Sequence, residues 1–163
     1  MDNLQIYRRN LPHWRLDGAV YFVTWRLYPG RPVLQPDERT KIVEILCHFE
    51  KARYLLIAYV VMDDHVHVVL QPAECVSLQQ IVHSWKSFSA RRLQQENGRI
   101  GALWQKESFD RIVRNETEWL EKIQYVMNNP YKRWPEMTAY PWVYPVAQAS
   151  VPAARCRHGG LHY

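Results

Sequence analysis

The sequence lacks the long hydrophobic runs that a membrane protein needs. No stretch of about 18 or more apolar residues occurs, so we expect no membrane-spanning helix. The N-terminal segment is polar and carries Arg8 and Arg9 without an apolar region behind them. This pattern argues against a secretory signal, and a cytoplasmic location is therefore expected.

Cysteine is also scarce. The three cysteines, Cys47, Cys75 and Cys156, form no CxxC pair, and an odd number cannot all pair within one chain. These features argue against a disulfide framework or a zinc knuckle. We therefore expect buried or idle thiols.

Aromatic side chains and positive charge, in contrast, are abundant. The chain contains seven Trp and ten Tyr among its 163 residues and has a formal charge of +5, with a pI of about 9.2. Rings stack on unpaired bases while cations hold phosphates, so this combination suits single-stranded nucleic acid. The length fits one domain. We assign that domain to residues 1–146 and expect a flexible tail at residues 147–163, which are rich in Ala, Pro, Gly and Arg.

The residue pattern predicts an α+β fold. Strands are indicated by β-branched and aromatic runs, and helices by apolar residues at helical spacing. Two strands are separated only by Asp63-Asp64 and should form a hairpin, so the expected sheet is antiparallel with helices packed on it. In chain order we predict a strand at 19–28, a helix at 37–51, strands at 53–62 and 65–71, a helix at 77–96, a strand at 107–113 and a helix from its N-cap Asn115 to Asn129, stopped by Pro130.

Two histidines stand on the third predicted strand, in the sequence HVHVVLQ. Successive side chains on a strand point to opposite faces, so His65 and His67 share one face, roughly 6–7 Å apart. Val66, Val68 and Leu70 share the other face, which can pack against helices. Two imidazoles at this spacing can converge on one metal ion. Two histidines on a half-exposed strand are also a common surface pattern, and here the apolar flanking strands favour the metal site.

The last predicted helix carries a tyrosine on its polar side. Tyr125 lies far from the centre of the apolar stripe, and Asn129 follows one turn later on the same face. A phenol is a better leaving group than an alkoxide, so a tyrosine–phosphate link is reversible and keeps bond energy for rejoining DNA. The free phenol has a pKa of about 10, and a divalent metal can assist its attack. The alternative is an exposed surface tyrosine. The apolar stripe comprises Trp119, Leu120, Ile123, Val126 and Met127.

These segments together resemble a known family. The strand HVHVVLQ, the segment WQKESFDRIVR at 104–114 and the segment YVMNNPYKRW at 125–134 are similar to the single-tyrosine HUH transposases. The similarity is greatest to the REP-associated tyrosine transposases, relatives of the IS200/IS605 insertion-sequence enzymes. It covers residues 6–143, including the first strand AVYFVTWRL. The resemblance implies a ferredoxin-like antiparallel sheet with helices packed on it.

The resemblance also implies residue roles. Tyr125 would be the nucleophile, His65 and His67 would bind Mg²⁺ or Mn²⁺, and Asn129 would complete the metal site, where insertion-sequence relatives commonly have Gln. The family cleaves single-stranded DNA hairpins of repetitive extragenic palindromes, leaving a 5′-phosphotyrosine and a free 3′-OH that can rejoin strands. A monomer is expected rather than a dimer. Two alternatives stay open: a non-catalytic hairpin-binding protein, and a metal-dependent nuclease that uses water.

Cations beside aromatic rings or along helix faces are candidate DNA contacts. They occur in the N-terminal segment YRRNLPHWR, on the helix at 77–96 and just after the helix that carries the tyrosine. A solvated arm or a plain charged helix face is the alternative in each place. The candidates are Arg8, Arg9, Trp14, Arg15, Lys86, Arg91, Arg92, Lys132 and Arg133.

Overall fold

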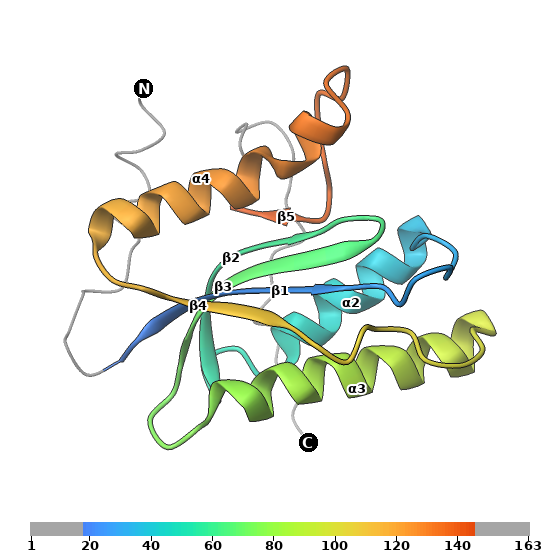
Figure 1. Ribbon diagram of the computed structural model, residues 1–163, viewed down its shortest axis with the longest axis horizontal. Helices are drawn as coiled ribbons and strands as arrows, with labels where there is room; N and C mark the ends of the chain where they lie inside the picture. Colours follow the sequence, from blue (N-terminus) through green and yellow to red (C-terminus); the bar gives the residue numbers. More distant parts are fainter. Residues whose placement is uncertain (1–17, 146–163) are drawn as a thin grey trace.

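The computed structural model describes residues 18–145 (Figure 1). The candidate DNA contacts Arg8, Arg9, Trp14 and Arg15 lie outside these residues, as does the tail predicted at 147–163. Within the described range, no helix is long and apolar enough to cross a membrane.

The order of helices and strands confirms the predicted β, α, β, β, α, β, α succession, with one short strand added at the end. Most boundaries agree with the sequence patterns to within one or two residues. The elements are β1 (Val20–Arg26), α2 (Pro36–His48), β2 (Tyr54–Val61), β3 (His65–Pro72), α3 (Leu78–Asn97), β4 (Phe109–Val113), α4 (Glu116–Arg133) and β5 (Val143–Tyr144).

The strands form one antiparallel sheet in the order β4-β1-β3-β2-β5. β2 and β3 pair as the predicted hairpin. The order β4-β1-β3-β2 interleaves two β-α-β units, which is the ferredoxin-like arrangement. The expected α+β fold with a ferredoxin-like antiparallel sheet is therefore confirmed.

Helices cover both faces of the sheet: α2 and α3 pack on one face and α4 on the other (Figure 1). Alternation along β3 assigns its side chains to these two layers. Val66, Val68 and Leu70 belong to the hydrophobic core under α2 and α3, as the sequence pattern predicted. Val69 belongs to the second core, under α4, where it lies with Trp119. His65 and His67, in phase with Val69, therefore face α4.

The helix α4 continues through Pro130 to Arg133, so the prediction that it ends at Asn129 is wrong. An interior proline removes a hydrogen bond and crowds the preceding turn. Here Pro130 is buried, so packing offsets that cost. Its carbonyl still accepts a hydrogen bond from the Trp134 N–H at 2.8 Å. The last turn also carries Lys132 and Arg133, and cations at this end stabilise the helix dipole.

Two smaller predictions also differ from the structure. The helix α2 ends at His48 and not at residue 51. Lys51 adopts a left-handed φ of 70° that a right-handed helix cannot contain.

The cysteines differ from one another. Cys75 is a free, exposed thiol, as expected. Cys47 is disulfide-bonded, so the expectation of idle thiols is wrong for that residue. An odd number of cysteines excludes complete pairing but still permits one pair.

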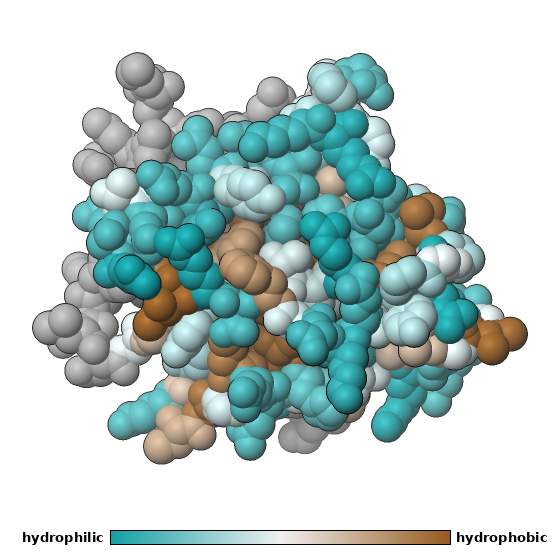
Figure 2. Space-filling model, viewed as in Figure 1, coloured by the Kyte–Doolittle hydropathy of each residue, from teal (hydrophilic) through white to brown (hydrophobic). Residues whose placement is uncertain are grey.

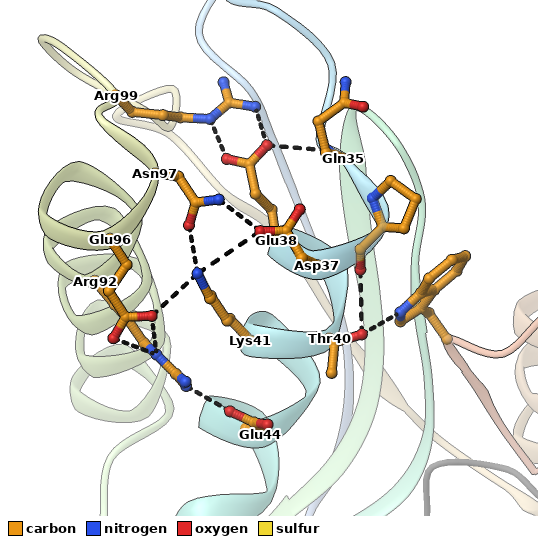
Figure 3. Close-up of polar contacts among 12 residues, drawn as sticks. Gln35, Asp37, Glu38, Thr40, Lys41, Glu44, Arg92, Glu96, Asn97 and Arg99 are labelled. Atoms are coloured by element: carbon orange, nitrogen blue, oxygen red, sulfur yellow. Dashed lines mark hydrogen bonds and ion pairs between the residues drawn. The ribbon is translucent and has the colours of Figure 1, made fainter.

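A polar network joins α2 to α3 on the face away from α4 (Figure 3). The Arg99 guanidinium forms two hydrogen bonds with the Glu38 carboxylate, which is only 3% exposed. Burial raises the pKa of Glu38, but the Arg99 hydrogen bond and charge lower it more, so the net pKa lies below its ordinary value. Lys41 on α2 adds an ion pair with Glu96 on α3 at 3.0 Å. These contacts fix the two helices that cover this side of the sheet.

Replacing Arg99 with Ala should lower the free energy of unfolding by about 3 kcal/mol, because Glu38 would stay buried without its cation. Chemical denaturation measures this loss. Arg91→Ala is the control: Arg91 is exposed on α3, which ends two residues before Arg99, and its removal should change stability by less than about 0.5 kcal/mol. A loss below about 1 kcal/mol for Arg99→Ala, the range of surface ion pairs, would contradict the structural role given to this pair.

Candidate active site

The register of β3 brings His65 and His67 together under α4. On the neighbouring strand β1, His65 lies opposite Arg26 and His67 lies opposite Thr24. Both imidazoles are buried, with exposed fractions of 7% and 3%. Their ring centroids are 4.6 Å apart, closer than the strand spacing alone predicts, because the rings lean toward each other. The prediction that they share a face is confirmed.

Each imidazole is held through its Nδ1 atom. His65 Nδ1 lies 2.6 Å from an oxygen of the Asp64 carboxylate, and His67 Nδ1 lies 2.6 Å from the Thr24 hydroxyl. Among the described residues, the Nε2 atoms of both rings make no hydrogen bond. Metal-binding histidines commonly use one nitrogen for the ion and donate the other N–H to a carboxylate or other acceptor. The pair therefore has the donor chemistry of a two-imidazole metal site.

The electrostatic surroundings keep His67 neutral. Burial, the neighbouring His65 and the charge of Arg26 lower the pKa of His67 from 6.5 to about 3. Burial raises the pKa of Asp64. The hydrogen bond with His65 and the charge of Arg133 lower the pKa by more than burial raises it, so the net pKa lies below the ordinary value. A neutral imidazole has the lone pair that a metal ion requires, and an ionised carboxylate is the stronger acceptor for His65.

The helix α4 carries Tyr125 to the same place. Asn115 caps the helix by accepting a hydrogen bond from the Glu118 N–H, as predicted, and the apolar stripe packs into the core. Tyr125 stays 40% exposed. Its ring centroid lies 5.3 Å from that of His67 and 5.8 Å from that of Phe22. The tyrosine on the polar side of the helix and the histidines on the strand thus form one cluster.

Two lysines flank this tyrosine. The Lys122 ammonium lies 5.9 Å and the Lys132 ammonium 5.3 Å from the Tyr125 ring centroid. Neither forms an ion pair with a carboxylate within residues 18–145, and the same holds for Arg26. Lys132 was among the candidate DNA contacts, whereas Lys122 and Arg26 were missed. Helical spacing could have identified Lys122, because it places Lys122 on the same side of the helix as Tyr125, Asn129 and Lys132.

Asn129 is half-buried one turn beyond Tyr125. Its side chain makes no hydrogen bond within the described part of the chain, and its role as a ligand stays a prediction. The residues from 18 to 145 contain no group of three or more His, Cys, Asp or Glu side chains that could hold a metal. A metal bound by His65 and His67 would therefore need a further donor, which is the role predicted for Asn129.

Arg133 joins the end of α4 to the turn between β2 and β3. Its guanidinium lies 3.1 Å from the Asp63 carboxylate and 3.5 Å from the Asp64 carboxylate. Asp64 is the residue that holds His65. The sequence pattern of Asp63-Asp64 indicated only a turn, so this link between the two parts of the site was missed.

The remaining candidate DNA contacts lie on α3, across the sheet from Tyr125. Lys86 donates hydrogen bonds to the carbonyls of Gln105 and Lys106. Arg92 forms an ion pair with Glu44 at 2.6 Å, while Arg91 is exposed. The structure therefore brings Lys132 and Arg133 to the cluster and leaves Lys86, Arg91 and Arg92 on the other face.

Comparisons with known proteins agree with this fold. The family described as "Transposase IS200 like" matches residues 17–129. A structure of a REP-associated tyrosine transposase bound to a REP hairpin has a TM-score of 0.61 and 16% identity, over 82% of this chain and 80% of that chain. A structure from Deinococcus radiodurans R1, described as a transposase, has a TM-score of 0.52 and 22% identity, over 72% of this chain and 95% of that chain. No protein with a curated description matches.

The imidazole of His67 should remain neutral between pH 8 and pH 5, because its pKa is lowered to about 3. NMR of the ring nitrogens measures this directly. Since unfolding returns the pKa to about 6.5, the unfolded chain binds a proton that the folded chain does not. The stability that His67 contributes is therefore present above pH 6.5 and falls as the pH drops toward 3. A titration midpoint near pH 6.5 in the folded protein would contradict the burial and charges described here.

Proposed function

Because the chain belongs to the IS200-like transposase family, we propose that it cleaves and rejoins single-stranded DNA hairpins through a covalent bond to Tyr125. The observation that carries the proposal is the approach of the Tyr125 ring to within 5.3 Å of His67. A family that cuts and rejoins DNA needs a nucleophile beside groups that bind the scissile phosphate. Tyr125 is an exposed tyrosine whose ring lies beside the histidine pair.

The reaction is a transesterification. The Tyr125 hydroxyl oxygen attacks the phosphorus, and the bond between the phosphorus and the 3′ oxygen of the preceding nucleotide breaks. The phenol loses its proton and the departing 3′ oxygen gains one, which leaves a 5′-phosphotyrosine and a free 3′-OH. Rejoining is the reverse attack by a 3′-OH, so the number of phosphodiester bonds is conserved.

The cations around Tyr125 suit this chemistry. Lys122, Lys132 and Arg26 lack carboxylate partners within residues 18–145, so their charge is available to the phosphate. In a partly buried site such charges act more strongly than in water. Lys122 and Lys132 lie on either side of Tyr125 along the helix and would hold a phosphate in front of its hydroxyl.

The histidine pair supports a metal-assisted version of the reaction. His65 and His67 would hold a divalent ion through their Nε2 atoms, with Asn129 as a third donor and Mg²⁺ or Mn²⁺ as the ion. When bound, the ion would withdraw charge from the scissile phosphate. Asp64 and Thr24 orient the two rings for this task through their Nδ1 atoms.

The hairpin substrate is proposed from the solved relative, a REP-associated tyrosine transposase bound to a REP hairpin. The formal charge of +5 supports a polyanionic partner. Tyr125 and His67 meet within a single chain, which supports a monomer as the active form because no second copy is needed to complete the cluster.

The proposal predicts a covalent protein–DNA adduct. The protein is incubated with Mn²⁺ and a 3′-labelled pool of hairpins whose single-stranded flanks are randomised, because the 3′ fragment is the one that stays on the protein, and the products are separated on a denaturing gel. We expect a slowly migrating band that disappears with EDTA and in Tyr125→Phe, while Tyr125→Phe keeps its DNA affinity.

Tyr131→Phe is the matched control, since Tyr131 lies on the same helix but packs against the core, and it should still form the adduct. Cleavage by Tyr125→Phe with a free 5′-phosphate would favour a water-using nuclease. Binding without adduct or cleavage by the unmodified protein would favour a non-catalytic hairpin-binding protein.

Replacing Asp64 with Ala should weaken Mn²⁺ binding about 10- to 100-fold, because His65 would lose the carboxylate that orients its ring. Electron paramagnetic resonance of free Mn²⁺ measures the affinity. Asp63→Ala is the control, since Asp63 also contacts Arg133 but makes no contact with His65. Equal Mn²⁺ affinities for the two variants would contradict the orienting role of Asp64.

A further inference from the structure

An exposed aromatic ring lies on the sheet beside the histidine pair. Phe109, the first residue of β4, is 59% exposed. The register of β4 sets it opposite Thr24, and Thr24 in turn lies opposite His67. The three residues therefore form one row across three adjacent strands.

Phe109 points to the face of the sheet that carries Tyr125. Val113, four residues along β4, belongs to the core under α4, and residues separated by an even number share a face. Phe109 and Arg111 are thus on the α4 side, whereas Ile112 is on the other side. Neighbouring strands are about 4.8 Å apart, so Phe109 lies about 10 Å from His67, within reach of a base whose phosphate sits at the histidine pair.

The segment before Phe109 is anchored. Lys86 donates hydrogen bonds to the carbonyls of Gln105 and Lys106 and to the Ser108 hydroxyl, at 2.7–3.2 Å. The Gln105 N–H also bonds to the carbonyl of Arg26 at 2.9 Å. A ring presented on an anchored backbone loses little freedom when it contacts a ligand.

The surroundings of Phe109 carry unpaired positive charge. Arg26 stands two residues beyond Thr24 on β1 and is a diagonal neighbour of Phe109, at about 7–8 Å. Arg26 is exposed and forms no ion pair with a carboxylate within residues 18–145. Lys122, over the neighbouring Phe22 ring at 4.8 Å, supplies a second such cation. Rings interleaved with free cations fit single-stranded nucleic acid better than an apolar protein surface.

The same region is visible from outside. In Figure 2, hydrophobic patches lie along the middle of the face, between α4 and α3, where β4 forms the edge of the sheet in Figure 1. Both Phe109 and Ile112 of β4 are among the exposed large hydrophobic residues.

From this arrangement we propose that Phe109 is a base-stacking position, which takes the unpaired nucleobase adjoining the scissile phosphate while Arg26 holds that nucleotide's backbone. This inference rests on the proposed function and deepens it: the strand would run from the histidine pair across Thr24 toward β4. Stacking on a ring accepts every base, so Phe109 contributes affinity and position for the strand.

The test is an abasic scan of DNA binding. The probe is a fluorescein-labelled hairpin with a single-stranded flank, selected by the unmodified protein from a pool with a randomised flank, and binding is followed by fluorescence anisotropy without metal. Phe109→Ala should weaken binding roughly 5- to 100-fold. One abasic substitution in the flank should weaken binding by the unmodified protein and have no further effect on Phe109→Ala. Phe109→Trp should restore the affinity.

Ile112→Ala is the matched control, an exposed apolar residue on the same strand but the opposite face, and it should bind like the unmodified protein. Adduct formation by the unmodified protein is scored on the same probe, which separates this inference from the proposed function. An adduct together with unchanged binding by Phe109→Ala would overturn the inference alone. Coupling between Phe109 and one base without an adduct would overturn only the tyrosine chemistry.

A third outcome concerns the sheet edge. If Phe109→Ala changes the sedimentation coefficient of the free protein and leaves the abasic scan unchanged, the ring contacts a second copy of the chain and the inference is wrong. If the unmodified protein selects no oligonucleotide from the pool, the inference and the proposed function both fail.

Discussion

The antiparallel pairing of β1 with β3 is the constraint on which the whole site depends. It sets Thr24 opposite His67 and Arg26 opposite His65, so one register supplies a hydrogen-bond partner and a cation to the histidine pair. A slip by one residue would turn every side chain of β3 to the other face. The apolar side chains on the α2 and α3 side resist such a slip, because it would place both imidazoles in the hydrophobic core under α2 and α3 and turn three aliphatic residues toward the histidine site under α4.

A second constraint acts along α4. The apolar side of this helix packs on the sheet, and the adjoining edge, with Lys122, Tyr125 and Lys132, lies beside the histidines. Arg133 then fastens the end of the helix to the turn that holds Asp64. Strand register and helix packing thus bring together the proposed nucleophile Tyr125, two imidazoles and several cations, although these residues are far apart in the sequence.

The sequence predicts much of this because the signals are local. Alternation along HVHVVL sets the face of each histidine, and helical spacing sets the polar side on which Tyr125 lies. What could not be predicted depends on tertiary contacts. Pro130 stays helical because the core buries it. The partners of Asp64 come from β3 and α4. Lys86 donates a hydrogen bond to the Gln105 carbonyl, in a loop that follows α3. The neighbours of Phe109 follow from strand register, which no single segment of the sequence contains.

The proposed chemistry requires the DNA to become attached to Tyr125. Trypsin cleaves after Lys122 and after Lys132, so it should release residues 123–132 as one peptide, IQYVMNNPYK, which contains both Tyr125 and Tyr131. Tandem mass spectrometry of the nuclease-trimmed adduct locates the nucleotide on one of the two rings. The site described here predicts a phosphodiester on Tyr125 alone, because Tyr125 is the ring that faces His67. A nucleotide on Tyr131, or on a residue outside this peptide, would contradict it.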